Sequence, residues 1–361
     1  MAIVAFGEIM ARIAPPERRR WRQALPGMVE VTWGGGEANA CVALALWGHP
    51  VRFITALPQH PLADALVATL RATGIDTRYI IRRAGRLGLY FVECGANQRG
   101  SSVLYDRQYS AVSLAEVEEF PFDEALTDAH WVHLTGITPA ISEQAFRAAC
   151  KLTQLAHQRQ ITVSCDLNFR KKLWTWSPGE TPHQLARRCM PEILQFAQLI
   201  IGNEEDAEDV LGIRAAGSDV QTGRLDISGY AGVARQVAER FPNARYVAIT
   251  LRESLSADYN RWGALLWDAR HQEIYFAPTD AQGQYCPYEI RDIVDRIGAG
   301  DCFAAGLIHG WTTWPDDPQR TLSFATAASC LKHSIHGDFA YVERSEVEAL
   351  LQGTGSGRVQ R

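Results

Sequence analysis

The chain has 361 residues, of which 47% are hydrophobic and 21% are charged, which is typical of a globular protein with one large α/β domain or two smaller ones. Its formal net charge of −5 argues against general binding to nucleic acid or to a membrane surface. The eight cysteines form no C-x-x-C pair and have no ligand-like spacing to histidine, so neither a disulfide framework nor a zinc site is expected.

The beginning of the chain lacks the pattern of a targeting segment. An apolar run at residues 3–6 starts at once, with no basic leader before it, and no stretch approaches the roughly 18 apolar residues of a membrane span. The sequence therefore predicts a cytoplasmic protein with no membrane partner. Residues 18–22 are locally basic, and we interpret them as a solvated loop rather than a binding patch.

Short β-rich runs alternate with helical patterns through much of the chain. Buried strands are expected at residues 3–6, 51–54, 131–134, 161–165, 199–201 and 246–250. Helices are expected at residues 37–47, 62–73, 142–158, 183–196 and 232–241. Such alternation predicts a mainly parallel sheet with helices on both faces, and ligands that gather near the carboxyl ends of its strands.

Two segments break this alternation. Residues 11–31 and 86–107 contain glycines and alternating polar and apolar residues but no convincing helix, so they predict strands outside the main sheet, in a small β flap. Residues 214–230 predict a surface loop, and the glycine-rich tail at 353–357 is expected to be flexible or only loosely docked.

The segment GAGD at residues 298–301 carries the strongest chemical signal. It precedes a small-residue run at 302–308 that predicts the first turns of a buried helix. Two glycines allow several N–H groups to point into one concavity, and a helix N-terminus adds partial positive charge, so the segment suits a phosphate. Asp301 could then take a proton from a hydroxyl that attacks a phosphoryl group. A glycine-rich turn whose Asp caps the helix explains the same letters, and the motif alone leaves both open.

A second glycine-rich segment, GGGEAN at residues 34–39, precedes an apolar helix. Its glycines allow a ligand to approach the backbone closely, and Asn39 offers both a donor and an acceptor. A strand-to-helix turn pinned by Asn39 is the alternative. Neither glycine-rich segment matches G-x-x-x-x-G-K-[ST] or G-x-G-x-x-G, which excludes the usual P-loop and argues against a dinucleotide fold.

Polar residues follow two of the predicted strands. Alternation through DLNFR at 166–170 puts Asp166, Asn168 and Arg170 on one side, and an Arg can hold a carboxylate or phosphate with two parallel hydrogen bonds. The alternative is an Asn/Asp turn with a surface Arg. NEED at 203–206 could order waters around Mg²⁺, but an Asn cap with acids in the first helical turn explains these letters as well.

The flap contains side chains suited to a small polyhydroxylated acid. Tyr90, Tyr105 and Arg107 lie near one another if the two flap segments pair as strands. The same residue types are also ordinary in strands and interfaces.

Taken together, GGGEAN, DLNFR, NEED and GAGD, in this order, resemble the signatures of the ribokinase-like (phosphofructokinase-B) family of sugar kinases. The resemblance covers nearly the whole chain. YDR at 105–107, DLNFRKKLW at 166–174 and VDRIGAGD at 294–301 are most similar to the 2-keto-3-deoxygluconate kinases of that family.

The resemblance implies one ribokinase-like domain over residues 1–361, a three-layer α/β/α sandwich whose β-lid comes from about residues 11–32 and 86–108, with a flexible tail at 353–361. It implies ATP as phosphoryl donor, Mg²⁺ as helper and Asp301 as catalytic base, beside an anion hole formed by Gly298, Ala299 and Gly300. The substrate-binding residues it implies are Gly34, Gly35, Asn39, Tyr90, Tyr105, Arg107, Asn168 and Arg170. The nucleotide-binding residues are Asn203, Thr250, Arg252, Gly298 and Gly300, and Asn203 and Asp206 would hold the metal through water.

Three departures from the family pattern stand out. Arg296 takes the place of a small or hydroxyl residue, and Asp206 takes the place of a Glu in the Asn-x-x-Glu motif. The usual glycine-rich nucleotide loop after Leu251 is replaced by RESLS and a longer segment that runs through Trp262.

The sequence thus predicts an ATP-dependent kinase that phosphorylates the terminal hydroxyl of 2-keto-3-deoxygluconate. A fructokinase or another ketose kinase is the alternative within enzymes, and a sugar-binding regulatory protein without turnover is the alternative outside them. A homo-oligomer, a dimer or larger, that associates through the lid is also expected, because exposed strand edges often pair with another subunit.

Overall fold

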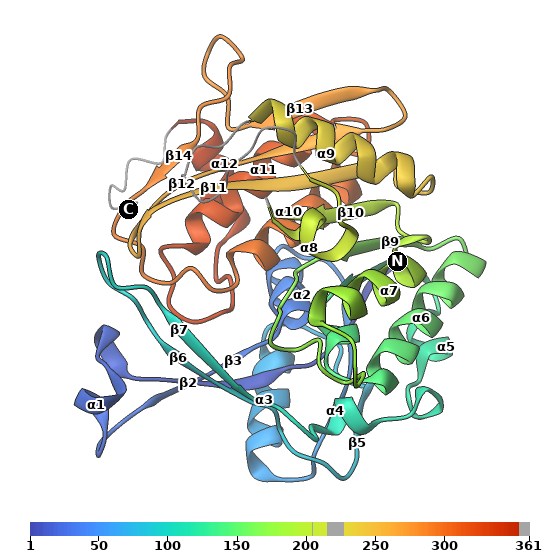
Figure 1. The fold of residues 1–361 in the computed structure, drawn as a ribbon, viewed down its shortest axis with the longest axis vertical. Coiled ribbons are helices and arrows are strands. Elements are labelled where there is room, and N and C mark those ends of the chain that lie inside the picture. Colours follow the sequence, from blue (N-terminus) through green and yellow to red (C-terminus); the bar gives the residue numbers. More distant parts are fainter. Residues whose placement is uncertain (204, 215–226, 354–361) are drawn as a thin grey trace.

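The computed structural model describes residues 1–203, 205–214 and 227–353, and Figure 1 shows its fold. The expected tail at 353–361 lies outside these residues except for Gly353, and so does most of the expected loop at 214–230. The last residues of that expected loop are helical, since a helix begins at Ile227 and not at residue 232.

The main sheet has ten strands in the order β13-β12-β11-β10-β9-β8-β1-β4-β5, and β14 pairs with β12. Pairing is parallel from β11 to β5, as the alternation of strands and helices predicts, and antiparallel among β11, β12, β13 and β14. The strands are β1 (Ala2–Phe6), β4 (Val51–Leu57), β5 (Ile80–Arg82), β8 (Ala129–Thr135), β9 (Thr162–Asp166), β10 (Leu199–Gly202), β11 (Tyr246–Ser256), β12 (Tyr259–Asp268), β13 (Glu273–Ala277) and β14 (Tyr288–Ile290).

Helices pack against both faces of this sheet. On one face lie α6 (Glu143–Gln158), α7 (Pro182–Leu194), α8 (Asp206–Leu211) and α9 (Ile227–Arg240), with the short α4 (Ala111–Leu114), η2 (Val117–Glu119), α5 (Phe122–Ala125) and η3 (Thr138–Ala140). On the other face lie α2 (Gly36–Leu46), α3 (Pro61–Ala72), α10 (Ala299–Thr313), α11 (Pro318–Lys332) and α12 (Arg344–Leu351). Among the described residues, no helix has both the length and the apolarity to cross a membrane.

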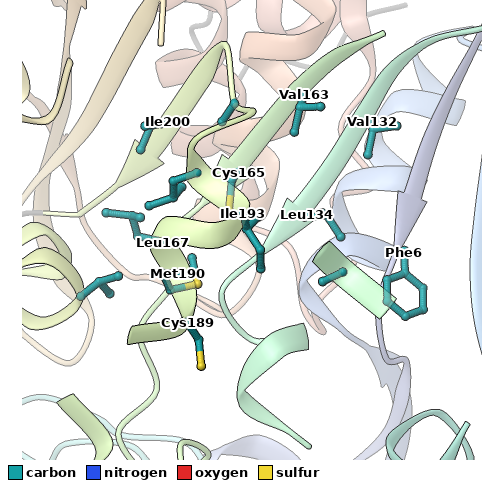
Figure 2. Close-up of a cluster of buried hydrophobic side chains, with 14 of the residues drawn as sticks. Phe6, Val132, Leu134, Val163, Cys165, Leu167, Cys189, Met190, Ile193 and Ile200 are labelled. Carbon is teal, nitrogen blue, oxygen red and sulfur yellow. The ribbon is translucent and has the colours of Figure 1, made fainter. Parts of the chain in front are cut away.

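Strand alternation divides the buried side chains into two cores. Val4 and Phe6 of β1 belong to one core, whereas Ile3 and Ala5 belong to the other. Figure 2 shows part of the first core, where strand residues such as Val163 pack over the helices. Because these strands are buried on both faces, they appear in the sequence as continuous apolar runs.

A separate four-stranded sheet, in the order β3-β2-β6-β7, forms the lid. Its strands are β2 (Met10–Ala14), β3 (Glu30–Gly34), β6 (Leu89–Glu93) and β7 (Ser102–Asp106). Figure 1 shows it projecting from the main body at the edge opposite α6. The expectation of no helix in 11–31 is wrong, since η1 (Pro16–Arg18) and α1 (Trp21–Ala24) lie there. Both are too short to show a helical period in the sequence.

The region after Leu251 differs from a nucleotide loop. β11 continues to Ser256 and turns at Ala257 and Asp258 into β12, so the predicted strand at 246–250 is six residues longer than expected. Pairing with β12 extends the strand, and no local apolar pattern signals this. The result is a long antiparallel hairpin beside the carboxyl ends of the parallel strands.

Candidate active site

A cavity of about 300 Å³ lies between the lid and the carboxyl ends of the parallel strands. It is lined by nearly all of the site residues expected from the sequence. These are Gly35, Asn39, Tyr90, Tyr105, Arg107, Asn168, Arg170, Asn203, Asp206, Thr250, Arg252, Gly298, Ala299, Gly300 and Asp301. Gly34 lies just behind the lining, where an added Cβ would meet Asp338 Oδ2 at 2.2 Å and the Tyr90 hydroxyl at 2.5 Å.

The GAGD segment forms the start of α10. Gly298 caps the helix with a φ of +84°, and a Cβ there would lie 2.1 Å from the carbonyl oxygen of Asp338, so the position requires glycine. The backbone N–H groups of Gly300 and Asp301 have no acceptor in the part of the chain that the structure describes. Two unpaired donors at a helix N-terminus, on the wall of a cavity, are suited to bind an anion.

Asp301 lies in the first turn of α10, buried beside the first turn of α2. Asn39 Nδ2 donates to Asp301 Oδ2 at 2.7 Å, and Asn39 Oδ1 accepts from the N–H of Gly35 at 3.2 Å. Burial raises the pKa of Asp301 to about 6, and the hydrogen bond from Asn39 acts in the opposite direction. The carboxyl group is therefore mostly ionised at neutral pH and able to accept a proton.

Two of the arginines that line the cavity, Arg107 and Arg170, differ in their partners. Arg107 is buried against Glu8, which accepts from its Nε at 2.6 Å and also contacts Nη2, while Arg107 Nη1 has no acceptor in the described structure. Arg170 is exposed and donates to the carbonyl of Phe169 at 2.9 Å, with no carboxylate within ion-pair distance among the described residues. Arg170 is thus a cation at the cavity wall without a bonded anion.

Asn203 and Asp206 bind each other's backbone. Asp206 accepts from the N–H of Asn203 at 2.9 Å and from the N–H of Phe169 at 3.0 Å, and Asn203 Oδ1 accepts from the N–H of Asp206 at 3.0 Å. Burial raises the pKa of Asp206 and places that of Asp166 well above its usual range. No cluster of three metal-ligating side chains occurs within residues 1–203, 205–214 and 227–353.

Several buried charged residues near the cavity were missed from the sequence. Asp338 accepts from the Tyr90 hydroxyl at 2.6 Å and from Arg12 Nη1 at 2.9 Å, and Arg12 also pairs with Asp295 at 2.6 Å. Asp295 lies within the quoted VDRIGAGD segment, but the letters around Arg12 and Asp338 match no motif. Arg12 comes from the lid and Asp338 from the segment between α11 and α12, so sequence spacing could not reveal that they pair.

Glu37, inside GGGEAN, was not assigned a role and is completely buried. Its Oε1 accepts from the N–H and hydroxyl of Thr135, each at 2.9 Å, and from the hydroxyl of Thr138 at 2.7 Å. Burial nevertheless raises its pKa to about 7. Glu37 thus ties the glycine-rich segment to the end of β8.

A buried carboxyl group beside unpaired helix N–H groups, under a lid and at the carboxyl ends of a parallel sheet, is the arrangement expected of a ribokinase-like sugar kinase. A model described as pfkB family carbohydrate kinase matches residues 2–226. The chain belongs to this family, so the expected fold class and the expected carbohydrate kinase chemistry with ATP are confirmed.

Three relatives illustrate the similarity within the family. The chain is 31% identical to a 2-dehydro-3-deoxygalactonokinase of Haloferax volcanii over 98% of each chain, and 26% identical to a 2-dehydro-3-deoxygluconokinase of Thermoproteus tenax over 88% of this chain and 85% of that one. The crystal structure of a 2-dehydro-3-deoxygluconokinase of Thermotoga maritima aligns with a TM-score of 0.88 at 40% identity, over 98% of this chain and all of that one.

Proposed function

We propose that this protein phosphorylates the terminal hydroxyl of 2-keto-3-deoxygluconate (2-dehydro-3-deoxygluconate) with ATP. The observation that carries the proposal is the guanidinium of Arg170, which has no bonded carboxylate among the described residues and lines the same cavity as Asp301. A cation and a base on the wall of one cavity suit a substrate that carries both a carboxylate and a hydroxyl, and the charge of Arg170 also acts to lower the pKa of Asp301. The names of the relatives from Thermoproteus tenax and Thermotoga maritima support the same substrate.

In this proposal each wall of the cavity has its own task. Asp301 takes the proton of the attacking hydroxyl, and the N–H groups of Gly300 and Asp301 stabilise charge on the transferred phosphoryl group. Arg170 binds the substrate carboxylate, assisted by Arg107 through its free Nη1. Gly35 and Asn39, with Gly34 behind them, form the loop that binds the sugar. Tyr90, Tyr105 and Asn168 position the sugar. Asn203, Thr250 and Arg252 face the nucleotide, together with GAGD.

The residues of the cavity fit a Mg²⁺ ion that arrives with the nucleotide. Each oxygen of Asp206 accepts one backbone hydrogen bond and keeps a second lone pair, which can accept from a water that Mg²⁺ holds, and Asn203 lies beside it. Bound there, the ion would neutralise charge on the phosphates. We therefore keep Asn203 and Asp206 as residues that hold the metal through water.

The lid supports a further part of the proposal, association into a homo-oligomer. Val31 on β3 and Leu104 on β7 are 53% and 64% exposed, and Met28 before β3 is 84% exposed. Burying such side chains against a second copy would be favourable. Light scattering of the wild type and of Leu104→Glu tests this: a lid-mediated dimer dissociates in the variant.

We also propose that the chain forms one kinase domain and acts in the cytoplasm, where its eight free cysteines stay reduced.

A panel of sugars with ATP tests the main proposal. Purified protein is assayed by coupled ADP release with 2-keto-3-deoxygluconate, its C4 epimer 2-keto-3-deoxygalactonate, fructose and gluconate, with Asp301→Asn as background. The highest kcat/KM for 2-keto-3-deoxygluconate is the expected result. Preference for the C4 epimer, which the name of the Haloferax volcanii relative suggests, would change the stereochemical assignment. Preference for fructose would replace the proposal by a ketose kinase, and no turnover with any sugar would favour a sugar-binding protein.

A further inference from the structure

Two of the places where this chain departs from the family pattern contact each other. Arg296 Nη2 donates to the carbonyl oxygens of Ser256 and Ala257, at 3.1 and 2.7 Å. Ser256 ends β11 and Ala257 begins the turn of the β11–β12 hairpin, which replaces the usual nucleotide loop. Arg296 precedes Gly298 by two residues, so the tip of the hairpin is bonded to the segment that forms the anion site.

The same hairpin tip also binds the lid. The N–H of Ala257 donates to the carbonyl of Asn97 at 2.7 Å, and the N–H of Asn97 donates back to Asp258 Oδ2 at 3.2 Å. Asn97 lies in the turn between β6 and β7, the two lid strands that Figure 1 shows reaching toward the β11–β12 end of the molecule. Two reciprocal hydrogen bonds therefore join the two hairpin turns.

A second lid segment reaches the same carboxylate. Arg18, at the end of η1 between β2 and β3, pairs with Asp258 Oδ2 at 3.3 Å and also donates to the carbonyl of Ile293. The N–H of Ile293 donates in turn to the carbonyl of Asp258 at 3.1 Å. The Ser256 hydroxyl holds Asp258 Oδ1 at 2.6 Å and, with the N–H of Asn97, lowers the pKa of Asp258. Asp258 is thus an ionised centre shared by the lid, the hairpin and the segment before GAGD.

We propose that residues 256–258 form a latch that holds the lid closed against the anion-site segment, with Asp258 as the positioning residue of the latch. The lid carries Tyr90, Tyr105 and Arg107, and the strand that leads to the latch carries Thr250 and Arg252 on the cavity wall. One hairpin therefore fixes the lid and the proposed nucleotide wall relative to each other. Opening the latch lowers the population of the closed lid, and the apparent affinity for the sugar falls by the same factor.

Amide hydrogen exchange of the protein without substrate tests the latch directly. Asp258→Ala is compared with Glu253→Ala, a change on the same hairpin that removes a carboxylate paired with Arg261 across the strands. In Asp258→Ala, amides in the β6–β7 turn are expected to exchange on the order of tenfold faster, while those of β9 and β10 stay as in the wild type. Equal exchange of the β6–β7 turn in both variants would overturn the latch.

A second variant and a kinetic measurement complete the test. Arg18→Ala removes the cation of the Arg18–Asp258 ion pair, and exchange of the amides in the β6–β7 turn should become faster in this variant too. Unchanged exchange of these amides in Arg18→Ala would limit the latch to the Asn97 turn and refute the role of Asp258 as a shared centre. The KM for 2-keto-3-deoxygluconate is expected to rise roughly fivefold in Asp258→Ala, while kcat stays within about twofold of the wild-type value. The KM of Asp258→Asn should lie between those of the wild type and Asp258→Ala. This kinetic arm rests on the proposed function. If the wild type does not turn over that sugar, the proposed function fails, and hydrogen exchange still decides the latch.

Discussion

Asn39 Nδ2 donates a 2.7 Å hydrogen bond to Asp301 Oδ2, although 262 positions separate the two residues in the chain. Asn39 lies in the first turn of α2 and Asp301 in the first turn of α10, and the two helices pack side by side in one core. The proposed sugar loop and the proposed base are thereby held together by a single contact between two helix N-termini.

Asp301→Asn is predicted to remove the base without removing the binding site. The amide keeps the shape of the side chain but cannot accept the proton, so kcat should fall by a factor on the order of 10² to 10⁴ while sugar binding stays largely intact. Steady-state kinetics and sugar titration measure the two effects separately. Asp106→Asn, which breaks an exposed ion pair with Arg86 on the lid, is the control and should behave like the wild type. Near-normal turnover in Asp301→Asn would remove Asp301 from the mechanism.

Asn39→Ala is predicted to change the pH dependence of the reaction. The pKa of Asp301 is about 6, raised by burial and lowered by the bond from Asn39, so activity should be lost as pH falls through about 6 and the carboxylate becomes protonated. Without the Asn39 donor the pKa rises, and the acid limb of kcat/KM moves to higher pH. Asn243→Ala, which removes a similar amide donor from the surface, should leave the limb in place. An acid limb that does not move in Asn39→Ala would show that another group controls it.

Arg170→Ala is predicted to reduce selectivity for an acid substrate. Loss of a charge-assisted pair that the bound substrate buries at the cavity wall should cost roughly 2–5 kcal/mol in kcat/KM. Fructose, which has no carboxylate, should be affected much less. Comparing kcat/KM for 2-keto-3-deoxygluconate and fructose in the wild type and the variant gives the answer. Equal losses for the two sugars would refute the carboxylate assignment.

Gly298→Ala and Gly300→Ala are predicted to differ sharply. A Cβ at position 298 meets the Asp338 carbonyl at 2.1 Å with φ at +84°, so this variant should lose about 2–4 kcal/mol of folding stability. A Cβ at position 300 meets nothing within 4 Å, and an Ala in a helix is favourable. Gly300→Ala should therefore fold normally but lose turnover, because the methyl group would occupy space needed by the phosphoryl group. Urea denaturation and kinetics measure both effects, and equal stabilities would contradict the steric argument.

Glu37→Gln is predicted to remove a pH-dependent penalty on stability. Burial raises the pKa of Glu37 from 4.5 to about 7, so between these values the folded state holds a proton that the unfolded chain has lost. The contribution of Glu37 to the free energy of unfolding is therefore highest below about pH 4.5. It falls by about 3 kcal/mol in total as pH rises through about 7. The free energy of unfolding is measured for the wild type and for Glu37→Gln as a function of pH. The difference, wild type minus variant, should fall by this amount between acidic and mildly alkaline pH. A difference that is independent of pH would exclude titration of Glu37, and Glu253→Gln serves as the surface control.

The order of elements and most of the cavity could be predicted from local patterns. Apolar runs such as 3–6 mark strands because a strand buried on both faces is nearly apolar throughout. GAGD marks a helix start because Gly298 has a positive φ and leaves no room for a Cβ. The polar residues directly after such strands, including Asn168, follow from the rule that parallel strands end at one edge. These signals depend on near neighbours in the chain, so a single sequence contains them.

Tertiary structure alone decided the partners of the buried charges and the course of the long hairpin. Arg12 and Asp338 are 326 positions apart, and their ion pair forms because the lid strand β2 packs against the segment between α11 and α12, beside Gly298. Nothing in the sequence around Asp258 distinguishes it from other acidic residues, and it contacts the lid only because β11 and β12 form a long hairpin. A charge can stay buried or shared only where another element supplies its partner, and that depends on packing between distant segments, which no local pattern encodes.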